Sequence, residues 1–237
     1  MNRERAVLAF DTATAATVVG LTVDGELVCE LADRPAAGQR PRHAERLLAI
    51  CEEALAEAGI GWDDLGRIGV GVGPGTFTGL RIGVATAQGL AQASGVELVA
   101  VSTLEALALP TRMAEPTVHV AAVADARRGE AYIAAWSPGG EQTVADQACP
   151  PQELVAVLAA ESGATIAVGD GALIFRKELE IGSIAVPDDR SALHQLAGAA
   201  LCQLAADSEP VGAEALVPYY VRQPDAEISL QARTESK

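Results

Sequence analysis

The chain has 237 residues and a formal net charge of −15, with 32 acidic against 17 basic side chains. Hydrophobic residues make up 49% of it and aromatic residues only 3%, so a core built mainly from aliphatic side chains is expected and disorder of the whole chain is excluded. Because nucleic-acid affinity comes largely from Lys and Arg that neutralise phosphates, we expect the isolated chain not to bind RNA directly.

The cysteines and the N-terminus point to a protein of the cytoplasm. The four cysteines contain no CxxC pair, and a chain of this size does not need disulfides, so reduced and mostly buried thiols are expected. They are Cys29, Cys51, Cys149 and Cys202. Residues 1–5 lead directly into a short apolar run, which does not fit a signal peptide, and no apolar stretch is long enough to span a bilayer. We therefore expect a cytoplasmic protein without membrane contact.

The first half is expected to open with three strands and then to alternate helices with strands. Asp24-Gly25 suits a two-residue hairpin turn between the second and third strands. Residues 43–58 form the clearest helix, because apolar side chains recur at helical spacing, glutamates take the other side, and Gly59 can end it. The expected strands are 6–10, 17–23, 26–31, 68–72 and 96–101, and the expected helices are 43–58, 76–93 and 103–109.

A similar order restarts after a break at 110–116, where two prolines are expected to end the helix. The first strand of this half ends at Asp125, as the first strand of the chain ends at Asp11. The expected strands are 117–124, 129–136, 142–145, 165–168 and 184–186, and the expected helices are 153–161, 175–180 and 191–206.

Each half thus follows the order β-β-β-α-β-α-β-α, without visible sequence identity between the halves. This pattern predicts an α/β protein of the actin-like ATPase (ASKHA) fold, with two subdomains built on mixed sheets. We expect an N-terminal subdomain at 1–108 and a C-terminal one at 109–190, with the helix at 191–206 packing back on the first. Residues 223–237 are expected to be a flexible tail.

The glycine-rich segment 73–79, Gly-Pro-Gly-Thr-Phe-Thr-Gly, lies where a strand leads into a helix. Backbone N–H groups at such a helix start can hold an anion. A Walker loop is excluded, because no Lys precedes Lys177, and the glycine spacing does not match a dinucleotide fingerprint. A tight turn without a ligand is the preferred interpretation, with Thr76 and Thr78 as helix caps.

The helix that follows carries a ridge without bulky side chains. Gly79, Gly83, Ala87 and Ala91 lie four residues apart. Each interior glycine costs about 1 kcal/mol against alanine, so close approach of another backbone should compensate. That backbone could belong to the protein's own domain or to a second protein chain, and the sequence does not separate the two.

Several segments together closely resemble the TsaB (YeaZ) family, and the resemblance covers nearly the whole chain. The most specific is the glycine-rich block 70–90, VGVGPGTFTGLRIGVATAQGL. Supporting matches are AVLAFDTAT at 6–14, RHAERLL at 42–48, DARRGEAY at 125–132, GDGA at 169–172 and PYYVR at 218–222.

The resemblance implies a subunit of the bacterial tRNA threonylcarbamoyladenosine machinery. That family has the ASKHA fold, partners the catalytic paralogue TsaD and the ATPase TsaE, and is regarded as a non-catalytic scaffold. Its members also self-associate through helices of the N-terminal domain, using the surface that otherwise receives TsaD. The helices 43–58 and 76–93 are expected to lie side by side on one face of the first domain, because a right-handed crossover leads to each from neighbouring strands. With the resemblance, these helices are expected to form the partner interface. The residues expected there are Leu47, Leu48, Cys51, Gly79, Gly83 and Ala87.

The catalytic paralogue carries two metal-binding histidines four positions apart on a helix, and this chain departs from that pattern. His43 is followed four positions later by Leu47, while His119 and His194 stand alone in the sequence. We therefore expect neither a metal nor another cofactor, with His43 partly exposed at a helix start.

A vestigial nucleotide cleft is the remaining candidate site. Asp11 and Asp125 end the first strand of each half, where ASKHA kinases place carboxylates that organise Mg-nucleotide, and Gly169 and Gly171 could belong to a remnant adenosine loop. Because the turn after Asp11 has no glycine to admit a phosphate, turn formation and strand-end capping are preferred for both aspartates. A positive-φ turn explains the glycines as well. The rival to the non-catalytic scaffold is a stand-alone ASKHA-fold enzyme, either metallopeptidase-like or a small-molecule kinase.

Overall fold

The computed structural model describes residues 6–36, 38–159 and 163–222, so the tail expected at 223–237 lies outside the described residues. Its N-terminal half contains β1 (Ala6–Asp11), β2 (Thr17–Val23), β3 (Glu26–Asp33), α1 (His43–Ala58), η2 (Trp62–Asp64), β4 (Arg67–Gly73), α2 (Phe77–Ser94), β5 (Glu97–Ser102) and α3 (Thr103–Ala114). Its C-terminal half contains β6 (His119–Asp125), β7 (Ala131–Trp136), β8 (Gln142–Cys149), α4 (Pro151–Leu158), β9 (Thr165–Val168), α5 (Asp170–Ile174), α6 (Arg176–Ile181), η3 (Ala192–His194) and α7 (Gly198–Asp207).

The two sheets repeat one plan. Within the described residues the N-terminal sheet has the order β3-β2-β1-β4-β5, and the C-terminal sheet has the order β8-β7-β6-β9. In both sheets the first three strands pair antiparallel, and the first strand of the half pairs parallel with the strand that follows the next helical segment. This duplicated mixed sheet is the arrangement of the ASKHA fold.

The C-terminal sheet is one strand smaller than expected. Residues 184–186 do not form a strand, and Ala185 makes only an isolated parallel bridge with Ile166 of β9. Pro187 follows at once and has no N–H to continue the ladder, which explains why pairing stops after a single bridge.

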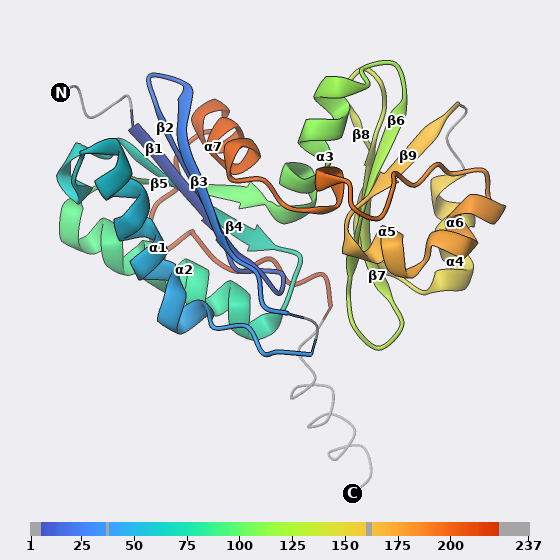
Figure 1. The fold of residues 1–237 in the computed structure, drawn as a ribbon, viewed down its shortest axis with the longest axis horizontal. Helices are drawn as coiled ribbons and strands as arrows, with labels where there is room; N and C mark the ends of the chain where they lie inside the picture. Colours follow the sequence, from blue (N-terminus) through green and yellow to red (C-terminus); the bar gives the residue numbers. More distant parts are fainter. Residues whose placement is uncertain (1–5, 37, 160–162, 223–237) are drawn as a thin grey trace, which may run out of the picture.

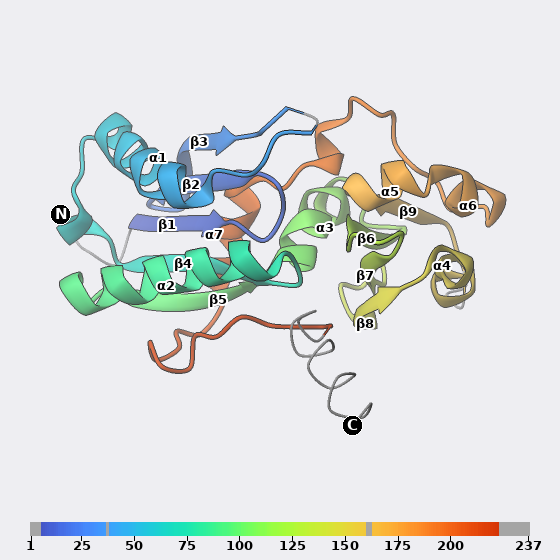
Figure 2. The same cartoon turned by 90° about the horizontal axis from the view of Figure 1, so that it is seen from below.

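Three hydrophobic clusters divide the molecule into layers. One fills the space between the N-terminal sheet and α1 and α2. Another fills the space between the C-terminal sheet and α4 to α6. The third joins the remaining face of both sheets with α3 and α7, so the two halves share one core. Figures 1 and 2 show this order, with α1 and α2 covering one face of the N-terminal sheet and α7 the other.

Strand β1 shows how the sequence produces these layers. Ala6, Leu8 and Phe10 enter the cluster beneath α1 and α2, whereas Val7 and Ala9 enter the cluster beneath α7. Side chains of a strand alternate between faces, so a strand covered by helices on both faces needs apolar residues on both, as at residues 6–10. All of β1 is buried accordingly.

Helix α3 crosses the expected boundary at 108/109. Pro110 lies inside this helix, which continues to Ala114, so the expected break does not begin there. A proline removes one intrahelical hydrogen bond, and here Leu107, Ala108 and Thr111 are buried around it, so tertiary packing offsets the loss. Ser102 caps the helix, since its side chain accepts the Glu105 N–H.

The last helix packs on the N-terminal sheet, against β1, β2 and β4. It begins at Gly198 rather than near Ser191, whose side chain instead caps the short turn η3. A side chain on Gly20 of β2 would overlap the backbone of Gly198, so this pair of glycines allows helix and strand to approach closely. After α7 the chain runs back along β5 and α2 to Arg222, at the boundary between the two halves (Figure 2).

Candidate functional site

The glycine ridge of α2 faces its own domain. Gly79, Gly83 and Ala87 are buried, and Thr12 Oγ1, in the turn after β1, donates a hydrogen bond of 2.7 Å to Gly79 O. A Cβ on Gly79 would overlap the Thr12 carbonyl oxygen, and a Cβ on Gly83 would lie 2.7 Å from Thr12 Oγ1. The turn between β1 and β2 therefore packs directly on the ridge. This corrects the expectation that these three residues meet a partner's helices.

Two of the three expected interface residues of α1 are also internal. Leu47 and Cys51 are buried in the cluster that α1 and α2 form with their sheet. Burial raises the pKa of the Cys51 thiol to about 12, so this cysteine is an unreactive core residue. Leu48 is 48% exposed and remains available on the outer side of the helix.

Of the expected interface residues, only Leu48 lies on the outward face of α1 and α2, and the rest of that face consists of other residues. Along α2 it carries Arg81, Ala85 and Gly89, which are exposed, and a Cβ built on Gly89 would meet nothing within 4 Å. Along α1 it carries Leu48 among exposed glutamates, of which Glu45 and Glu52 are examples. The two helices pack against each other on the same face of the sheet, so these residues share one surface (Figure 2). We refer to this surface as the outer helix face.

Asp11 is fully engaged inside the protein. Its Oδ1 accepts the Ala13 N–H at 2.6 Å and its Oδ2 accepts the Thr103 hydroxyl at 2.6 Å. Burial raises the pKa of Asp11 above its ordinary value, and the hydrogen bonds with Thr103 and Ala13 lower it only in part. Gly71 of β4 leaves room for the carboxylate, because a side chain at that position would overlap it. The aspartate thus ties the end of β1 to the start of α3.

Asp125 organises the turn after β6. Its side chain accepts the Arg127 N–H at 2.8 Å and pairs with the Arg127 guanidinium at 3.1 Å. Its own N–H donates to Asp170 Oδ1, which also accepts the Gly171 N–H. Asp125 and Asp170 therefore connect two strand ends of the C-terminal half.

The two glycines of the expected remnant loop have packing roles in the structure. Gly169 has a φ of 113°, and a Cβ there would overlap Val123 O. Gly171 lies against the backbone of Val123 and Ala124. The Nδ1 of His194 lies 3.1 Å from Gly169 O, so the loop is also held from η3.

His43 is buried rather than partly exposed. Its Nδ1 lies 2.8 Å from Thr17 Oγ1, and burial lowers the pKa of the imidazole, which favours the neutral ring. Within the described residues no group of three or more His, Cys, Asp or Glu could hold a metal ion. None of the described helices is long and apolar enough to cross a membrane.

The four cysteines are buried and none takes part in a disulfide, as expected.

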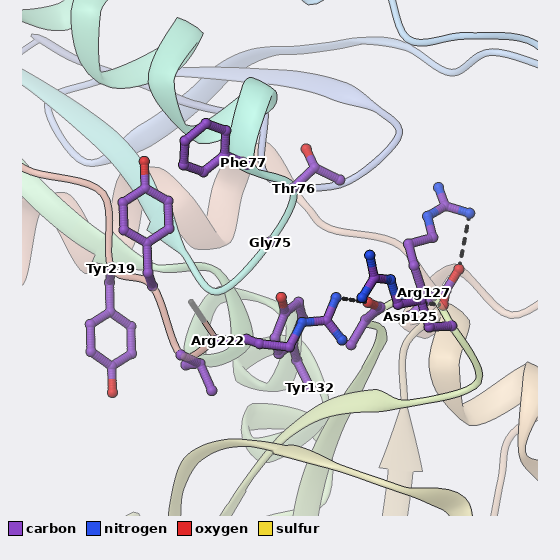
Figure 3. A pocket seen from close by; sticks show the side chains of 12 residues that line it. Gly75, Thr76, Phe77, Asp125, Arg127, Tyr132, Tyr219 and Arg222 are labelled. Carbon is purple, nitrogen blue, oxygen red and sulfur yellow. Dashed lines mark hydrogen bonds and ion pairs between the residues drawn. The ribbon is translucent and has the colours of Figure 1, made fainter. Parts of the chain in front are cut away.

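Two cavities lie near the strand ends that were expected to form a cleft. One, of about 230 Å³, is lined by Thr14, Thr103, Asp170 and His194 among others. The other, of about 220 Å³, is lined by residues of three segments: the start of α2, the turn after β6, and the end of the described chain (Figure 3). Asp125 lines this second cavity, whereas Asp11, Gly169 and Gly171 line neither.

Sequence reasoning missed several residues that make contacts over long distances in the sequence. Thr103 was expected only as part of a helix, although its hydroxyl donates a hydrogen bond to Asp11. Arg222 bonds Glu130 and Ala126 O across the boundary, while Tyr220 accepts a hydrogen bond from Arg81 and stacks on Phe77. The segment 218–222 that contains both residues was noted for its resemblance, but nothing in its spacing indicates what it touches.

Comparisons with known proteins agree with one another. The family model described as TsaD, tRNA N6-adenosine threonylcarbamoyltransferase, matches residues 35–181. The tRNA threonylcarbamoyladenosine biosynthesis protein TsaB of Escherichia coli is 32% identical over 231 residues, covering 91% of this chain and 94% of the relative. The TsaB of Haemophilus influenzae is 31% identical over 197 residues, covering 77% of this chain and 80% of the relative.

Among solved structures, YeaZ from Pseudomonas aeruginosa matches with a TM-score of 0.73 and 28% identity, covering 91% of this chain and 99% of that chain. The similarity in sequence and in structure extends over nearly the whole length of these relatives. The chain is therefore a member of the TsaB (YeaZ) family.

Proposed function

We propose that this chain is a non-catalytic subunit in the biosynthesis of threonylcarbamoyladenosine in tRNA. In this proposal it binds and activates the transferase TsaD and works together with the ATPase TsaE. The names of its relatives, which are tRNA threonylcarbamoyladenosine biosynthesis proteins, and the match to the TsaD family model support the pathway. The hydrogen bonds at the end of strand β1 support the absence of a catalytic role.

The main observation against a catalytic role is that Asp11 is buried and hydrogen-bonded within the protein. A carboxylate that organises Mg-nucleotide must reach its ligand, but both oxygens of Asp11 accept hydrogen bonds from the protein and the side chain has no exposed surface. The turn that follows is seated against Gly79 and Gly83 of α2. Asp11 and the turn after it therefore have a structural role. A phosphate could bind there only if the hydrogen bonds of Asp11 and the packing of the turn on α2 were both broken.

The outer helix face is the proposed binding surface for TsaD. It offers the apolar side chain of Leu48, and small residues at Ala85 and Gly89 over which a partner's helix can approach closely. The glutamates on α1 complement a basic partner. Because a paralogue with the same fold can meet this face in pseudo-twofold fashion, a second copy of this chain can also occupy it when TsaD is absent.

The charge of the chain supports a division of labour with its partners. At −15 it repels tRNA, so the complex must hold its substrate mainly through another subunit. A scaffold that positions TsaD does not need to contact RNA.

Reconstitution tests the proposal. The purified chain, TsaD and TsaE from one organism are mixed with tRNA, threonine-derived acyl donor and ATP, singly and together, and modified nucleoside and ATP hydrolysis are measured. We expect modification to depend on this chain and TsaD together, with no ATP hydrolysis by this chain alone. Hydrolysis or modification by this chain alone would instead favour the stand-alone ASKHA-fold enzyme.

A further inference from the structure

The second cavity, which we call the arginine cavity, is lined by Gly75, Thr76, Phe77, Asp125, Ala126, Arg127, Arg128, Tyr132, Tyr219, Tyr220, Val221 and Arg222. Its side chains come from both halves of the molecule and from the last described segment (Figure 3). Neither Asp11 nor the turn after β1 lines it, so it is separate from the expected cleft at that strand end.

The charge of the lining is opposite to that of the chain. The lining residues include three arginines and one aspartate, although acidic residues outnumber basic ones 32 to 17 in the whole sequence. Arg127 pairs with Asp125 through one nitrogen, and Arg222 uses two nitrogens for Glu130 and Ala126 O. Since each guanidinium carries five N–H donors in a planar fork, these bonds leave Arg127 and Arg222 with donors for a further acceptor.

The start of α2 adds a second source of positive potential to the cavity. Gly75, Thr76 and Phe77 lie at the N-terminus of this 18-residue helix, and the Thr76 side chain accepts no N–H of its first turn, contrary to the expectation that it caps the helix. The positive end of a helix dipole and its first N–H groups favour a bound anion. Arginine side chains and a helix N-terminus therefore line the same cavity.

The remaining walls are aromatic. All three tyrosines of an aromatic-poor chain line the cavity, together with Phe77. Phe77 and Tyr220 stack with their ring centres 5.3 Å apart, and the Arg81 guanidinium lies 3.6 Å from the centre of the Phe77 ring. This wall is partly apolar, and the volume of about 220 Å³ suits a phosphate with a small attached group better than a large ligand.

From this convergence we propose that the arginine cavity binds the phosphate group of a small phosphorylated molecule. Arg127 and Arg128 hold the phosphate from the C-terminal half, Arg222 from the terminal segment, and the start of α2 from the N-terminal half. The residues of the outer helix face do not line this cavity, although Arg81 of that face packs on the Phe77 ring of the cavity wall.

The test is a titration of the full chain with inorganic phosphate and with AMP at constant ionic strength, followed by phosphorus NMR and thermal unfolding. The test variant is Arg127→Gln with Arg128→Gln. Both side chains are exposed, and the positive φ at these positions is no more strained for glutamine than for arginine. The matched control is Arg40→Gln with Arg190→Gln, two exposed arginines elsewhere, which changes the net charge equally.

We expect saturable binding of phosphate to the chain, weakened about tenfold or more in the test variant and unchanged in the control. Tighter binding of AMP than of phosphate would identify a nucleotide as the source of the group, and equal binding would identify free phosphate. The proposal is overturned if the unmodified chain shows no saturable binding, or if the test and control variants weaken it equally.

Discussion

Thr12 and the glycines of α2 form a contact that tolerates no added atom. The Thr12 carbonyl occupies the position of a side chain at Gly79, and the Thr12 hydroxyl bonds the Gly79 carbonyl. The intrinsic cost of glycine in a helix, about 1 kcal/mol for each residue, is offset here by the packing of the β1–β2 turn. The ridge is thus explained within one chain, without a partner.

This contact gives the first prediction. Gly79→Ala should lower the free energy of unfolding by about 1–3 kcal/mol, because the new methyl group meets backbone that cannot easily move. Gly89→Ala is the matched control, since it lies on the same helix with open space around it and should raise the stability by up to about 1 kcal/mol. Chemical denaturation of both variants checks this. Equal effects at the two positions would contradict the packing of the ridge.

Asp11 gives a prediction about pH. Burial raises its pKa in the folded chain above the ordinary value of 3.8, so the folded state binds this proton more tightly than the unfolded state. Stability contributed by this group is therefore greatest at low pH and falls as the pH rises through the folded pKa. Asp11→Asn removes the charge but keeps a side-chain oxygen for the Ala13 N–H. Relative to the unmodified chain, the variant should gain stability as the pH rises from the ordinary carboxyl pKa of 3.8 through the raised pKa of folded Asp11.

Thermal unfolding across that pH range measures the difference. A stability difference that does not change with pH would show that Asp11 is not the buried titrating group. Because we assign Asp11 a structural role, the variant should also support tRNA modification with TsaD, whereas loss of modification by a folded variant would restore a catalytic role.

At the scale of single elements, the outer helix face can be tested without disturbing the core. Leu48→Asp places a charge at a site that is 48% exposed, so the fold should persist while binding of TsaD and self-association both weaken at least tenfold. Leu27→Asp on β3 is the matched control, because Leu27 is 49% exposed and does not belong to the outer helix face. Co-elution with TsaD and sedimentation of the isolated chain measure both effects. If Leu48→Asp binds like its control, the interface lies elsewhere.

The success of sequence reasoning differed between elements for physical reasons. Helix α1 is found with its bounds as expected, because its apolar spacing is regular and Gly59 ends it in a left-handed conformation. Helix α3 runs past Pro110 because tertiary packing offsets the lost hydrogen bond, and a local pattern does not show such packing. Residues 184–186 fail to form a strand because Pro187 follows them, which is a local signal that the sequence does contain.

The candidate site was harder to predict than the fold. The sequence identified the ridge at Gly79 and Gly83 as a place of close approach, which is correct, but the backbone that approaches belongs to Thr12. Residues whose partners are distant in the sequence, such as Thr103 and Arg222, carry no periodic or spacing signal, because those partners lie about 90 positions away. Only the three-dimensional structure brings these groups together.

At the scale of the molecule, the segment after α7 contacts β4, β5 and α2 of the N-terminal half. Its Val211 bonds β5, its Leu216 is buried in the cluster beneath α2, and its Tyr219 N–H donates to Val72 O of β4. Gln88 of α2 donates to the carbonyls of Ala213 and Leu216. The segment therefore belongs to the N-terminal half by packing, although it comes last in the described chain.

Leu216 should anchor this segment. Leu216→Ala is expected to lower the free energy of unfolding by about 2–5 kcal/mol, because the side chain is fully buried and its loss leaves a cavity. The neighbouring Val217 is 59% exposed, so Val217→Ala should change the stability by less than about 0.5 kcal/mol. Denaturation curves of the pair decide the matter, and similar values would mean that the segment is not held by its apolar side chain.

Arg222 then connects that anchored segment to the C-terminal half. It pairs with Glu130 at 2.5 Å and donates to Ala126 O, and both partners lie in the turn between β6 and β7. Both ends of the ion pair are partly exposed, so its contribution to global stability should be about 1 kcal/mol or less. Its effect should be local: Arg222→Gln is expected to speed amide hydrogen exchange across residues 126–130, where the Ala126 N–H is bonded to Glu130 O. Arg190→Gln, an exposed arginine away from this turn, should leave that exchange unchanged. Exchange that is equally slow in both variants would mean that the halves are held together by the shared core of α3 and α7 alone.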